Sequence, residues 1–243
     1  ILQTSLPEPV LLDENALTKV CRVIRYSLAL TLRETDPSTF MEPSSLRLYH
    51  LERGISVALY GMKANRQLSL QSYIGYTLFK NGYPIAYGGS WIFGQRANFG
   101  LNIFEAFRGG ESGYVMCQLL RTYIHAFQLT HIEVEPYQYG LDNPDGIATG
   151  AFWFYYKYGF RPVDKQLNSL ATTEFKKIQS KPGYRSSEKT LLRFTESNIA
   201  WHRDTTTTPP FDKIVGKISR LIRTNFKGQR QVALHTSREQ LKP

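Results

Sequence analysis

The sequence predicts an α+β domain over residues 1–200, followed by a linker and a basic amphipathic tail over residues 201–243. Asn81 and Gly82 separate two runs rich in Tyr, Ile, Thr and Phe, which is the pattern of a hairpin between antiparallel strands. Further along, helix-like and strand-like patterns alternate between residues 114 and 163. Locally paired strands combined with separate helices are typical of the α+β class.

The first predicted helix begins after Asp13, a residue type that caps helices by accepting a hydrogen bond from a free backbone N–H. Apolar residues then recur at three- and four-residue steps up to Leu32. Pro37 ends the helix, because proline disfavours helical geometry in the residue before it. The next segment, residues 46–62, fits both a helix and a strand interrupted at Gly54, and we favour a helix there.

Three strands in a row lead into a glycine-rich turn. Residues 72–80 and 83–93 form the hairpin, and residues 99–105 form a third strand that runs into a Phe-Arg-Gly-Gly sequence. A helix-like segment, residues 114–127, follows directly. Such a turn directs backbone N–H groups and the positive end of the helix into one space, where phosphate oxygens bind well. Arg108 adds a positive charge, and glycine allows the backbone to approach a ligand closely.

The remaining elements alternate in type up to the end of the domain. Residues 144–150 contain proline and glycine and predict an extra loop. The expected elements are a strand at 131–135, a helix at 148–158, a strand at 160–163, a helix at 167–179 and a strand at 189–195 that closes the edge of the sheet.

Most of the net charge of +10 lies in the tail. Residues 212–243 hold eight basic and two acidic side chains, a net charge of +6, which leaves +4 for the rest of the chain. Residues 205–210, TTTTPP, have the composition of a linker, and the apolar residues from Ile214 to Phe226 fall on one side of a helix. The tail has three interpretations: a solvated helix, an element that docks on an anionic membrane or nucleic acid, or one that packs against another domain of a longer protein.

Cysteine and histidine usage argues against several classes of protein. Cys21 and Cys117 have neither metal-ligand spacing nor the number needed for a disulfide framework. Each lies in a helix-like apolar pattern, so we expect reduced thiols and a cytoplasmic protein. The five histidines are scattered and predict no metal site. No apolar run reaches the roughly 18 residues of a membrane span.

Residues 154–160, FYYKYGF, and the glycine-rich turn that follows Leu101, together with the interval between these two motifs, resemble the GCN5-related N-acetyltransferase (GNAT) superfamily. Residues 154–160, FYYKYGF, are similar to the family's FYxKxGF sequence, which closes its second cofactor helix. One helix, one strand and one more helix separate the motifs, as in the family. The other motif resembles the end of the family's fourth strand and the start of its pyrophosphate loop, on Leu101, Ile103, Phe107, Arg108, Gly109 and Gly113.

The resemblance implies a mixed, mostly antiparallel sheet flanked by helices, in which the fourth and fifth strands splay apart and acyl-CoA enters the gap. Acetyl-CoA or another acyl-CoA is then the co-substrate. The main chain at the strand end would pair with the pantetheine arm, and the loop would bind the pyrophosphate. The implied cofactor-binding residues are Ile103, Phe104, Arg108, Gly109, Gly110, Ser112 and Gly113.

The resemblance also implies catalytic residues. Tyr155 falls at the position of the family's general acid, which protonates the departing CoA thiolate. A tyrosine suits this role because its ordinary pKa of about 10 keeps the proton available at neutral pH. A general base must take a proton from the attacking amine, and the acidic side chains near the gap are Glu105, Glu133 and Glu135. We favour Glu105 and Glu135.

The favoured function is therefore transfer of an acyl group from acyl-CoA to an amine by direct attack in a ternary complex. The alternative is a non-catalytic GNAT-like module of a larger protein, which binds a partner or senses CoA. Two departures from the family pattern support it. Glu111 stands where the loop carries a glycine, and Asn143 lies 12 residues before Tyr155, further than the family's asparagine. If the loop binds phosphate, Glu111 is expected to point away from it, towards solvent or a basic neighbour.

Overall fold

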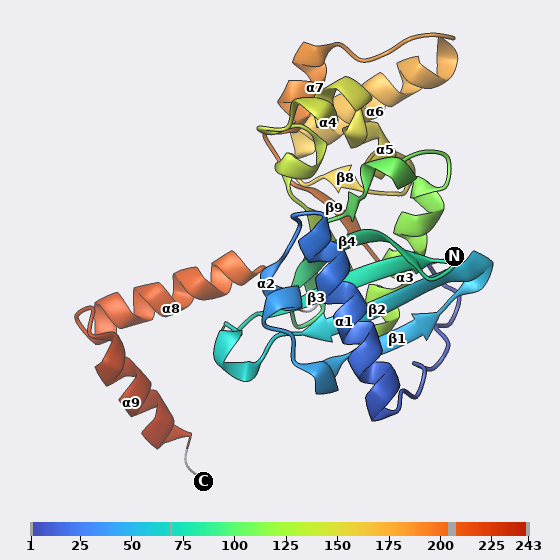
Figure 1. Cartoon of the computed structure of the whole chain (residues 1–243). Coiled ribbons are helices and arrows are strands. Elements are labelled where there is room, and N and C mark those ends of the chain that lie inside the picture. The colour runs from blue at the N-terminus through green and yellow to red at the C-terminus, as the bar shows by residue number, and fades with distance from the viewer. Residues whose placement is uncertain (1, 69, 204–207, 242–243) are drawn as a thin grey trace. The chain divides into compact units, whose positions relative to one another are not determined.

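A nine-stranded sheet organises the computed structural model, which describes residues 2–68, 70–203 and 208–241. The strands run in the order β1-β2-β3-β4-β5-β7-β9-β8, and the short β6 pairs with β4 (Figure 1). Among the described residues, β5 and β7 form the one parallel pair of this sheet, so it is mixed and mostly antiparallel, as predicted. The strands are β1 (Arg47–His50), β2 (Ile55–Gly61), β3 (Ser72–Lys80), β4 (Tyr83–Phe93), β5 (Arg96–Phe99), β6 (Asn102–Ile103), β7 (His131–Val134), β8 (Arg161–Pro162) and β9 (Ile199–His202).

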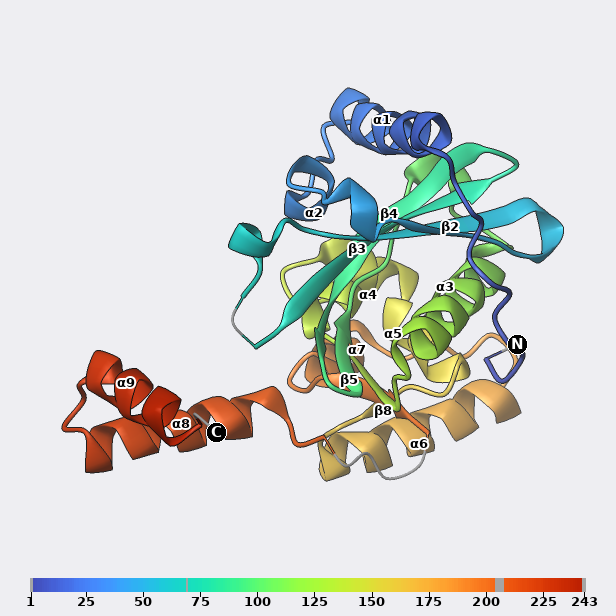
Figure 2. The same ribbon diagram turned by 90° about the horizontal axis from the view of Figure 1, so that it is seen from below.

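Helices cover both faces of the sheet. α1 (Glu14–Leu30) and the short α2 (Asp36–Thr39) lie on one face, and α3 (Ser112–Phe127) lies on the other (Figure 2). Asp13 caps α1 by accepting a hydrogen bond from the backbone N–H of Ala16 at 2.7 Å. The predicted first helix and its cap are therefore confirmed, but the helix ends at Leu30, and Pro37 lies in the first turn of α2 instead of ending α1.

Each face of the sheet has its own apolar core. On the α1 side, Ile24 and Leu28 pack with Tyr60 of β2. On the α3 side, Tyr123 packs edge-on against Tyr76 of β3, with ring centroids 6.1 Å apart. The central strands are therefore buried on both faces.

Residues 46–62 form two strands, and the predicted helix is wrong. β1 and β2 pair antiparallel around a turn in which Arg53 and Gly54 have positive φ angles of 58° and 68°. β2 lies between β1 and β3, and six of its seven residues are buried. A strand covered on both faces does not alternate between apolar and polar residues, so its pattern resembles that of a buried helix.

The strands after the hairpin diverge, which confirms the predicted splay. β5 and β7 pair at three positions, the last of which joins Asn98 and Glu133. β6 then pairs with β4, whereas the chain leaves β7 at Glu135 to form the 3-10 helix η5 (Pro136–Tyr139). No pairing joins β6 to β7 among the described residues. The gap expected between the fourth and fifth strands therefore lies between β6 and β7.

Two short helices replace the loop and single helix predicted after η5. α4 (Pro144–Thr149) begins at Asn143, whose side chain accepts a hydrogen bond from the backbone N–H of Gly146. The chain then bends at Gly150, where φ is 66°, and α5 (Ala151–Lys157) follows. The predicted extra loop is wrong because Asn143 and a proline at the first helical position start a helix there.

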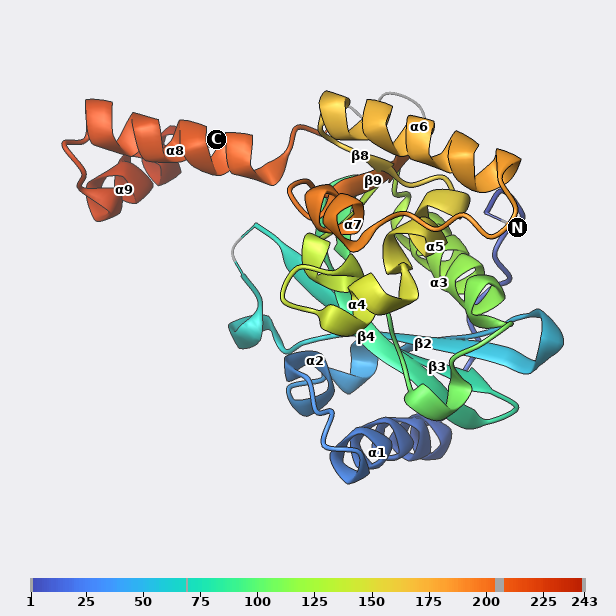
Figure 3. The same cartoon turned by 90° about the horizontal axis from the view of Figure 1, so that it is seen from above.

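The last part of the domain contains two further helices and β9, which pairs with β7 on one side and with β8, the edge strand, on the other. α6 (Lys165–Ser180) confirms the helix predicted at residues 167–179. Residues 189–194 belong to α7 (Glu188–Phe194) and Thr195 follows as its C-cap, so the predicted edge strand is wrong there. Ser187 caps α7, and the Phe194 ring stacks on another helix, so these residues face helices instead of a neighbouring strand. Figure 3 shows α4, α5, α6 and α7 gathered beside β8 and β9.

Contacts divide the chain into two units, Ile1–Thr206 and Thr207–Pro243. The second unit holds α8 (Phe211–Asn225) and α9 (Arg230–Gln240), and residues 205–207 of the predicted linker lie outside the described residues. α8 is amphipathic, as predicted, and three of its large apolar side chains are 38–46% exposed, namely Val215, Ile218 and Leu221. Among the described residues, no helix has the length and apolar composition needed to cross a bilayer.

Candidate functional site

Gln138 bridges the gap between β6 and β7. Its side-chain oxygen accepts one hydrogen bond from the backbone N–H of Leu101 at 3.1 Å and another from the hydroxyl of Tyr155 at 3.2 Å. Leu101 directly precedes β6, and Gln138 belongs to η5, which follows β7. Two donors from different elements therefore converge on one oxygen position in the gap.

Tyr155 lies on α5 with 3% of its surface exposed. The rings of Tyr139 and Phe160 pack edge-on against it, with centroids 6.5 and 5.6 Å away. Burial disfavours the charged phenolate and raises the pKa of Tyr155 well above its ordinary value of 10. The hydroxyl therefore carries its proton at neutral pH.

Glu133 is held by three neighbours. Its carboxylate contacts Arg96 at 2.7 Å, His131 at 2.8 Å and Asn198 at 3.1 Å. The hydrogen bond with His131, helped by those from Asn198 and Arg96, lowers the pKa of Glu133 to about 2, against the opposing effect of burial. A carboxylate this weakly basic is unsuited to remove a proton from an amine.

The two favoured bases are exposed. Glu135 follows β7, and its carboxylate accepts a hydrogen bond from the side chain of Asn98 at 2.9 Å. Glu105 begins the 3-10 helix η4 (Glu105–Phe107), just beyond β6. Among the described residues, no hydrogen bond joins either carboxylate to Tyr155. Both therefore lie at the ends of the strands that border the gap, without direct contact with the buried phenol.

The glycine loop forms a closed turn at the start of α3. The backbone N–H of Gly109 donates to the hydroxyl of Ser112 at 3.0 Å, and the N–H of Ser112 donates back to the carbonyl of Gly109 at 3.0 Å. Glu111 makes no capping bond to the helix and instead pairs with Lys80, 3.1 Å away. This confirms that Glu111 points towards a basic neighbour. The first N–H groups of a helix have no intrahelical partner, so this end of α3 keeps donors for an anion.

Gly113 is needed because Tyr158, at the end of α5, packs against the first turn of α3. A Cβ atom at position 113 would lie 1.7 Å from the Tyr158 hydroxyl oxygen. The two motifs found in the sequence therefore touch each other at this glycine.

Arg108 points back along β6. Its Nε donates to the carbonyl of Ile103 at 3.1 Å, and the next N–H, that of Phe104, donates to Ile85 of β4 at 2.9 Å. In an antiparallel pair the groups that bond the partner strand alternate with groups that face away, so the Ile103 carbonyl faces away from β4. Arg108 therefore covers the main-chain edge expected to pair with pantetheine.

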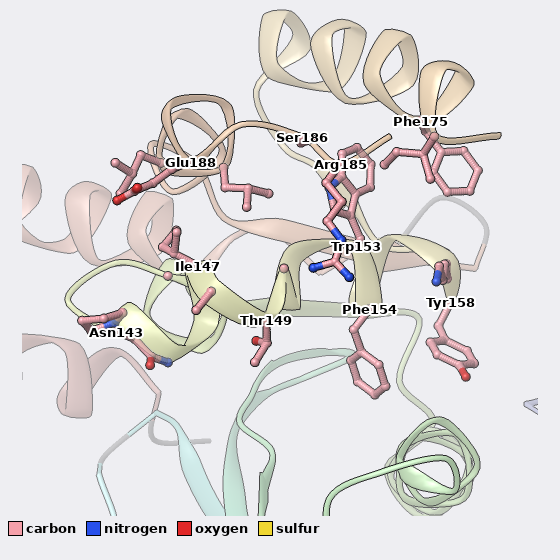
Figure 4. A pocket seen from close by; sticks show the side chains of 18 of the residues that line it. Asn143, Ile147, Thr149, Trp153, Phe154, Tyr158, Phe175, Arg185, Ser186 and Glu188 are labelled. Atoms are coloured by element: carbon pink, nitrogen blue, oxygen red, sulfur yellow. The ribbon is translucent and has the colours of Figure 1, made fainter. Parts of the chain in front are cut away.

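A cavity of about 940 Å³ lies beside the glycine loop (Figure 4). One part of its wall is the loop, a second is the bend between α4 and α5, and a third is the segment between α6 and α7. Its size is within the range of small-molecule sites, roughly 300–1,000 Å³. The lining includes Gly109, Gly110, Gly113, Asn143, Thr149, Trp153, Phe154, Tyr158, Phe175 and Arg185.

The predicted site residues fall into two places. Three of the seven predicted cofactor-binding residues line the cavity, namely Gly109, Gly110 and Gly113. The others are outside its lining: Ile103, Phe104, Arg108 and Ser112, together with Tyr155, Glu105 and Glu135. The phenol is brought to the gap in the sheet, and the glycines are brought to the cavity.

Several residues at these sites were not predicted. Neither Gln138 nor Arg185 lies within a motif that predicts a site. Lys157, which also lines the cavity, stands within FYYKYGF and could have been found from that motif. The charged residues of the lining are Asp142, Lys157, Arg185 and Glu188.

No family model matches the chain, and no curated protein matches it significantly. Among solved structures, it is similar to the N-acetyltransferase PseH of Campylobacter jejuni, with 10% sequence identity and a TM-score of 0.36. The alignment covers 82% of this chain and 98% of that protein. A similarity at this level does not assign the chain to a family.

Proposed function

We propose that the unit Ile1–Thr206 is a GNAT-like acyltransferase that moves an acetyl or other acyl group from acyl-CoA to an amine. The observation that carries this proposal is the convergence of the Leu101 N–H and the Tyr155 hydroxyl on the Gln138 oxygen. A thioester needs one donor for its carbonyl oxygen and one for its departing sulfur. Both kinds of donor meet at the gap, and the Gln138 amide would rotate aside when a thioester enters.

The reaction would proceed by direct attack of the amine on the thioester carbon. The Leu101 N–H would stabilise the negative charge that develops on the carbonyl oxygen. The carbon–sulfur bond then breaks, and the leaving thiolate takes the proton of Tyr155. Glu105 or Glu135 would accept the proton lost by the amine, since both are exposed carboxylates at the ends of the strands that border the gap.

The cavity would hold the rest of acyl-CoA. The free N–H groups at the start of α3 would bind the pyrophosphate, and the glycines at 109 and 110 leave room for its close approach. Arg108 could join the phosphate site only after releasing the Ile103 carbonyl. The same release would free the main-chain edge for pantetheine.

A second function, the non-catalytic module, is favoured by two of the same contacts. Gln138 fills the gap, and Arg108 covers the Ile103 carbonyl. If these contacts were permanent, the chain could bind CoA in the cavity or a partner protein without placing a thioester against Tyr155.

Thermal unfolding with acetyl-CoA and longer acyl-CoAs, followed by an assay of thiol release with a panel of amines, tests the proposal. A ligand at 100 times its Kd stabilises the folded state by about 2.7 kcal/mol, so binding gives a clear rise in melting temperature. The enzyme requires saturable stabilisation together with amine-dependent thiol release. Stabilisation without thiol release from any amine supports the CoA-sensing module. If millimolar ligand gives neither stabilisation nor thiol release, acyl-CoA binding is contradicted. The partner-binding module is then the remaining function.

A further inference from the structure

The segment between α6 and α7 is tied to one buried carboxylate. Glu174 of α6 is 4% exposed, and its Oε2 accepts hydrogen bonds from the hydroxyls of Tyr184 at 2.9 Å and Ser186 at 2.8 Å. Its Oε1 accepts a hydrogen bond from Lys177 at 2.7 Å. The residues on both sides of Arg185 are therefore fixed to the same group.

Arg185 extends in the opposite direction, into the cavity. Residues 184–187 have no helical structure, and side chains alternate in direction along an extended chain. Because Tyr184 and Ser186 reach Glu174, Arg185 is directed away from it. Figure 4 shows its guanidinium in the space between the α6–α7 segment and α5, and Arg185 is one of the lining residues. No hydrogen bond or ion pair of this side chain occurs among the described residues.

Arg185 shares the cavity with a second cation and with aromatic rings. Lys157 of α5 lines the cavity as a second cation, and the rings of Phe154 and Tyr158 lie on the same side as Arg185 in Figure 4. Glu188 lies at the other end of the view. A guanidinium binds phosphate oxygens through two parallel hydrogen bonds, and aromatic rings offer faces to a base. This combination suits the phosphorylated nucleotide end of a cofactor.

We propose that Arg185 binds a phosphate group of acyl-CoA and that Glu174 is a positioning residue, which holds Arg185 over the cavity through Tyr184 and Ser186. The inference rests on the proposed function, because it takes acyl-CoA as the ligand of this cavity. The buried carboxylate fixes the loop before the ligand arrives, so less conformational freedom is lost on binding.

Titration calorimetry of CoA and 3′-dephospho-CoA tests the role of Arg185. Arg185→Ala should weaken CoA binding roughly 10- to 100-fold, the effect of losing hydrogen bonds to a charged group. The matched control is Arg193→Ala, an exposed arginine on α7 outside the lining, which should leave the affinity near that of the wild type. If the 3′-phosphate is the contact, Arg185→Ala abolishes the preference for CoA over 3′-dephospho-CoA. If the pyrophosphate is the contact, both ligands weaken equally.

Two outcomes would overturn different claims. Equal CoA affinity of the wild type and Arg185→Ala removes Arg185 from the site but leaves the proposed function standing. A wild type that binds neither ligand removes acyl-CoA from the cavity, and with it both proposals.

The role of Glu174 is tested by Glu174→Gln in the wild-type and Arg185→Ala backgrounds. Positioning predicts a several-fold loss of CoA affinity in the first background and none in the second, while the loss of thermal stability is the same in both. The same loss of affinity in both backgrounds would show a merely structural role. Where Glu174→Gln does not fold, Tyr184→Phe combined with Ser186→Ala removes the two tethers and keeps the carboxylate, with the same expectation.

Discussion

Replacing Tyr155 by phenylalanine separates the effect of its hydroxyl from that of its ring. The edge-on contacts with Tyr139 and Phe160 involve the ring and remain in the variant. One hydrogen bond to Gln138 is lost, and at 3.2 Å it is long for a bond between oxygens. The Gln138 oxygen still accepts the N–H of Leu101. We therefore expect the free energy of unfolding to fall by no more than about 0.5–1.5 kcal/mol, the range for one hydrogen bond.

The effect on turnover should be much larger. If the hydroxyl protonates the departing thiolate, thiol release at saturating acyl-CoA and amine should fall roughly 10²–10⁴-fold, which is about 3–5 kcal/mol of transition-state stabilisation. The Kd of acyl-CoA from calorimetry should stay close to that of the wild type. Tyr139→Phe is the matched control, because it removes a buried hydroxyl that donates to the Ser197 carbonyl instead of pointing into the gap. A Tyr155→Phe enzyme with wild-type turnover would refute the assignment.

The pH dependence gives a second readout for Tyr155. Burial raises its pKa above 10, so the folded protein keeps this proton at pH values where an exposed tyrosine would lose it. Ionisation of Tyr155 should therefore cause no decline in turnover near pH 10. A decline there that is present in the wild type and absent from Tyr155→Phe would contradict this. The unfolded chain ionises first, so Tyr155 contributes stability below about pH 10 that is lost as the pH rises further.

Four further changes test other parts of the site. Gly113→Ala would place a methyl group 1.7 Å from the Tyr158 hydroxyl, so the free energy of unfolding should fall by about 1–3 kcal/mol. Thermal melts should show a smaller loss when Tyr158→Ala removes the hydroxyl and ring. An equal loss in the wild-type and Tyr158→Ala backgrounds would contradict the clash. Glu133→Gln should weaken the dependence of the free energy of unfolding on pH between about 4.5 and 2. The pKa of Glu133 is lowered from 4.5 to about 2, so its carboxylate contributes stability above pH 4.5 that is lost as the pH falls towards 2. Identical acid-unfolding curves of the variant and the wild type would count against this. Glu111→Gly should change the free energy of unfolding by less than about 1 kcal/mol and leave CoA affinity unchanged or slightly higher, whereas a large loss of affinity would place Glu111 in the ligand site. Gln138→Ala should tighten acyl-CoA binding in calorimetry if its amide occupies the place of the thioester, and an unchanged Kd would show that it does not.

Local signals in the sequence determined the elements whose causes are themselves local. The Asn81-Gly82 pair sets the β3–β4 hairpin because both residues take positive φ angles, 49° and 82°. Asp13 starts α1 because its side chain bonds a backbone N–H three residues away. The same holds for α6, and for the glycine loop that opens α3. In each case the residues that specify the element lie within one or two turns of it.

The tertiary structure decided which of two local patterns applied. The apolar residues of β2 suit a helix and a strand equally, and its position between β1 and β3 selects the strand. In α7, Phe194 stacks on Phe152 with ring centroids 4.0 Å apart, a contact between segments 42 residues apart in the sequence, so these residues pack against a helix instead of forming an edge strand. No local pattern contains information about such a partner.

The candidate site shows the same division more strongly. The sequence by itself determined that a glycine turn, a helix and FYYKYGF belong together, and the packing of Gly113 against Tyr158 agrees with that. Only the tertiary structure decided that Arg108 turns to Ile103, that Gln138 accepts a hydrogen bond from the Tyr155 hydroxyl, and that a distant segment adds a wall to the cavity. Side-chain direction depends on which groups of other elements are within reach, and those groups are fixed by the packing of the sheet and its helices instead of by neighbours in the sequence.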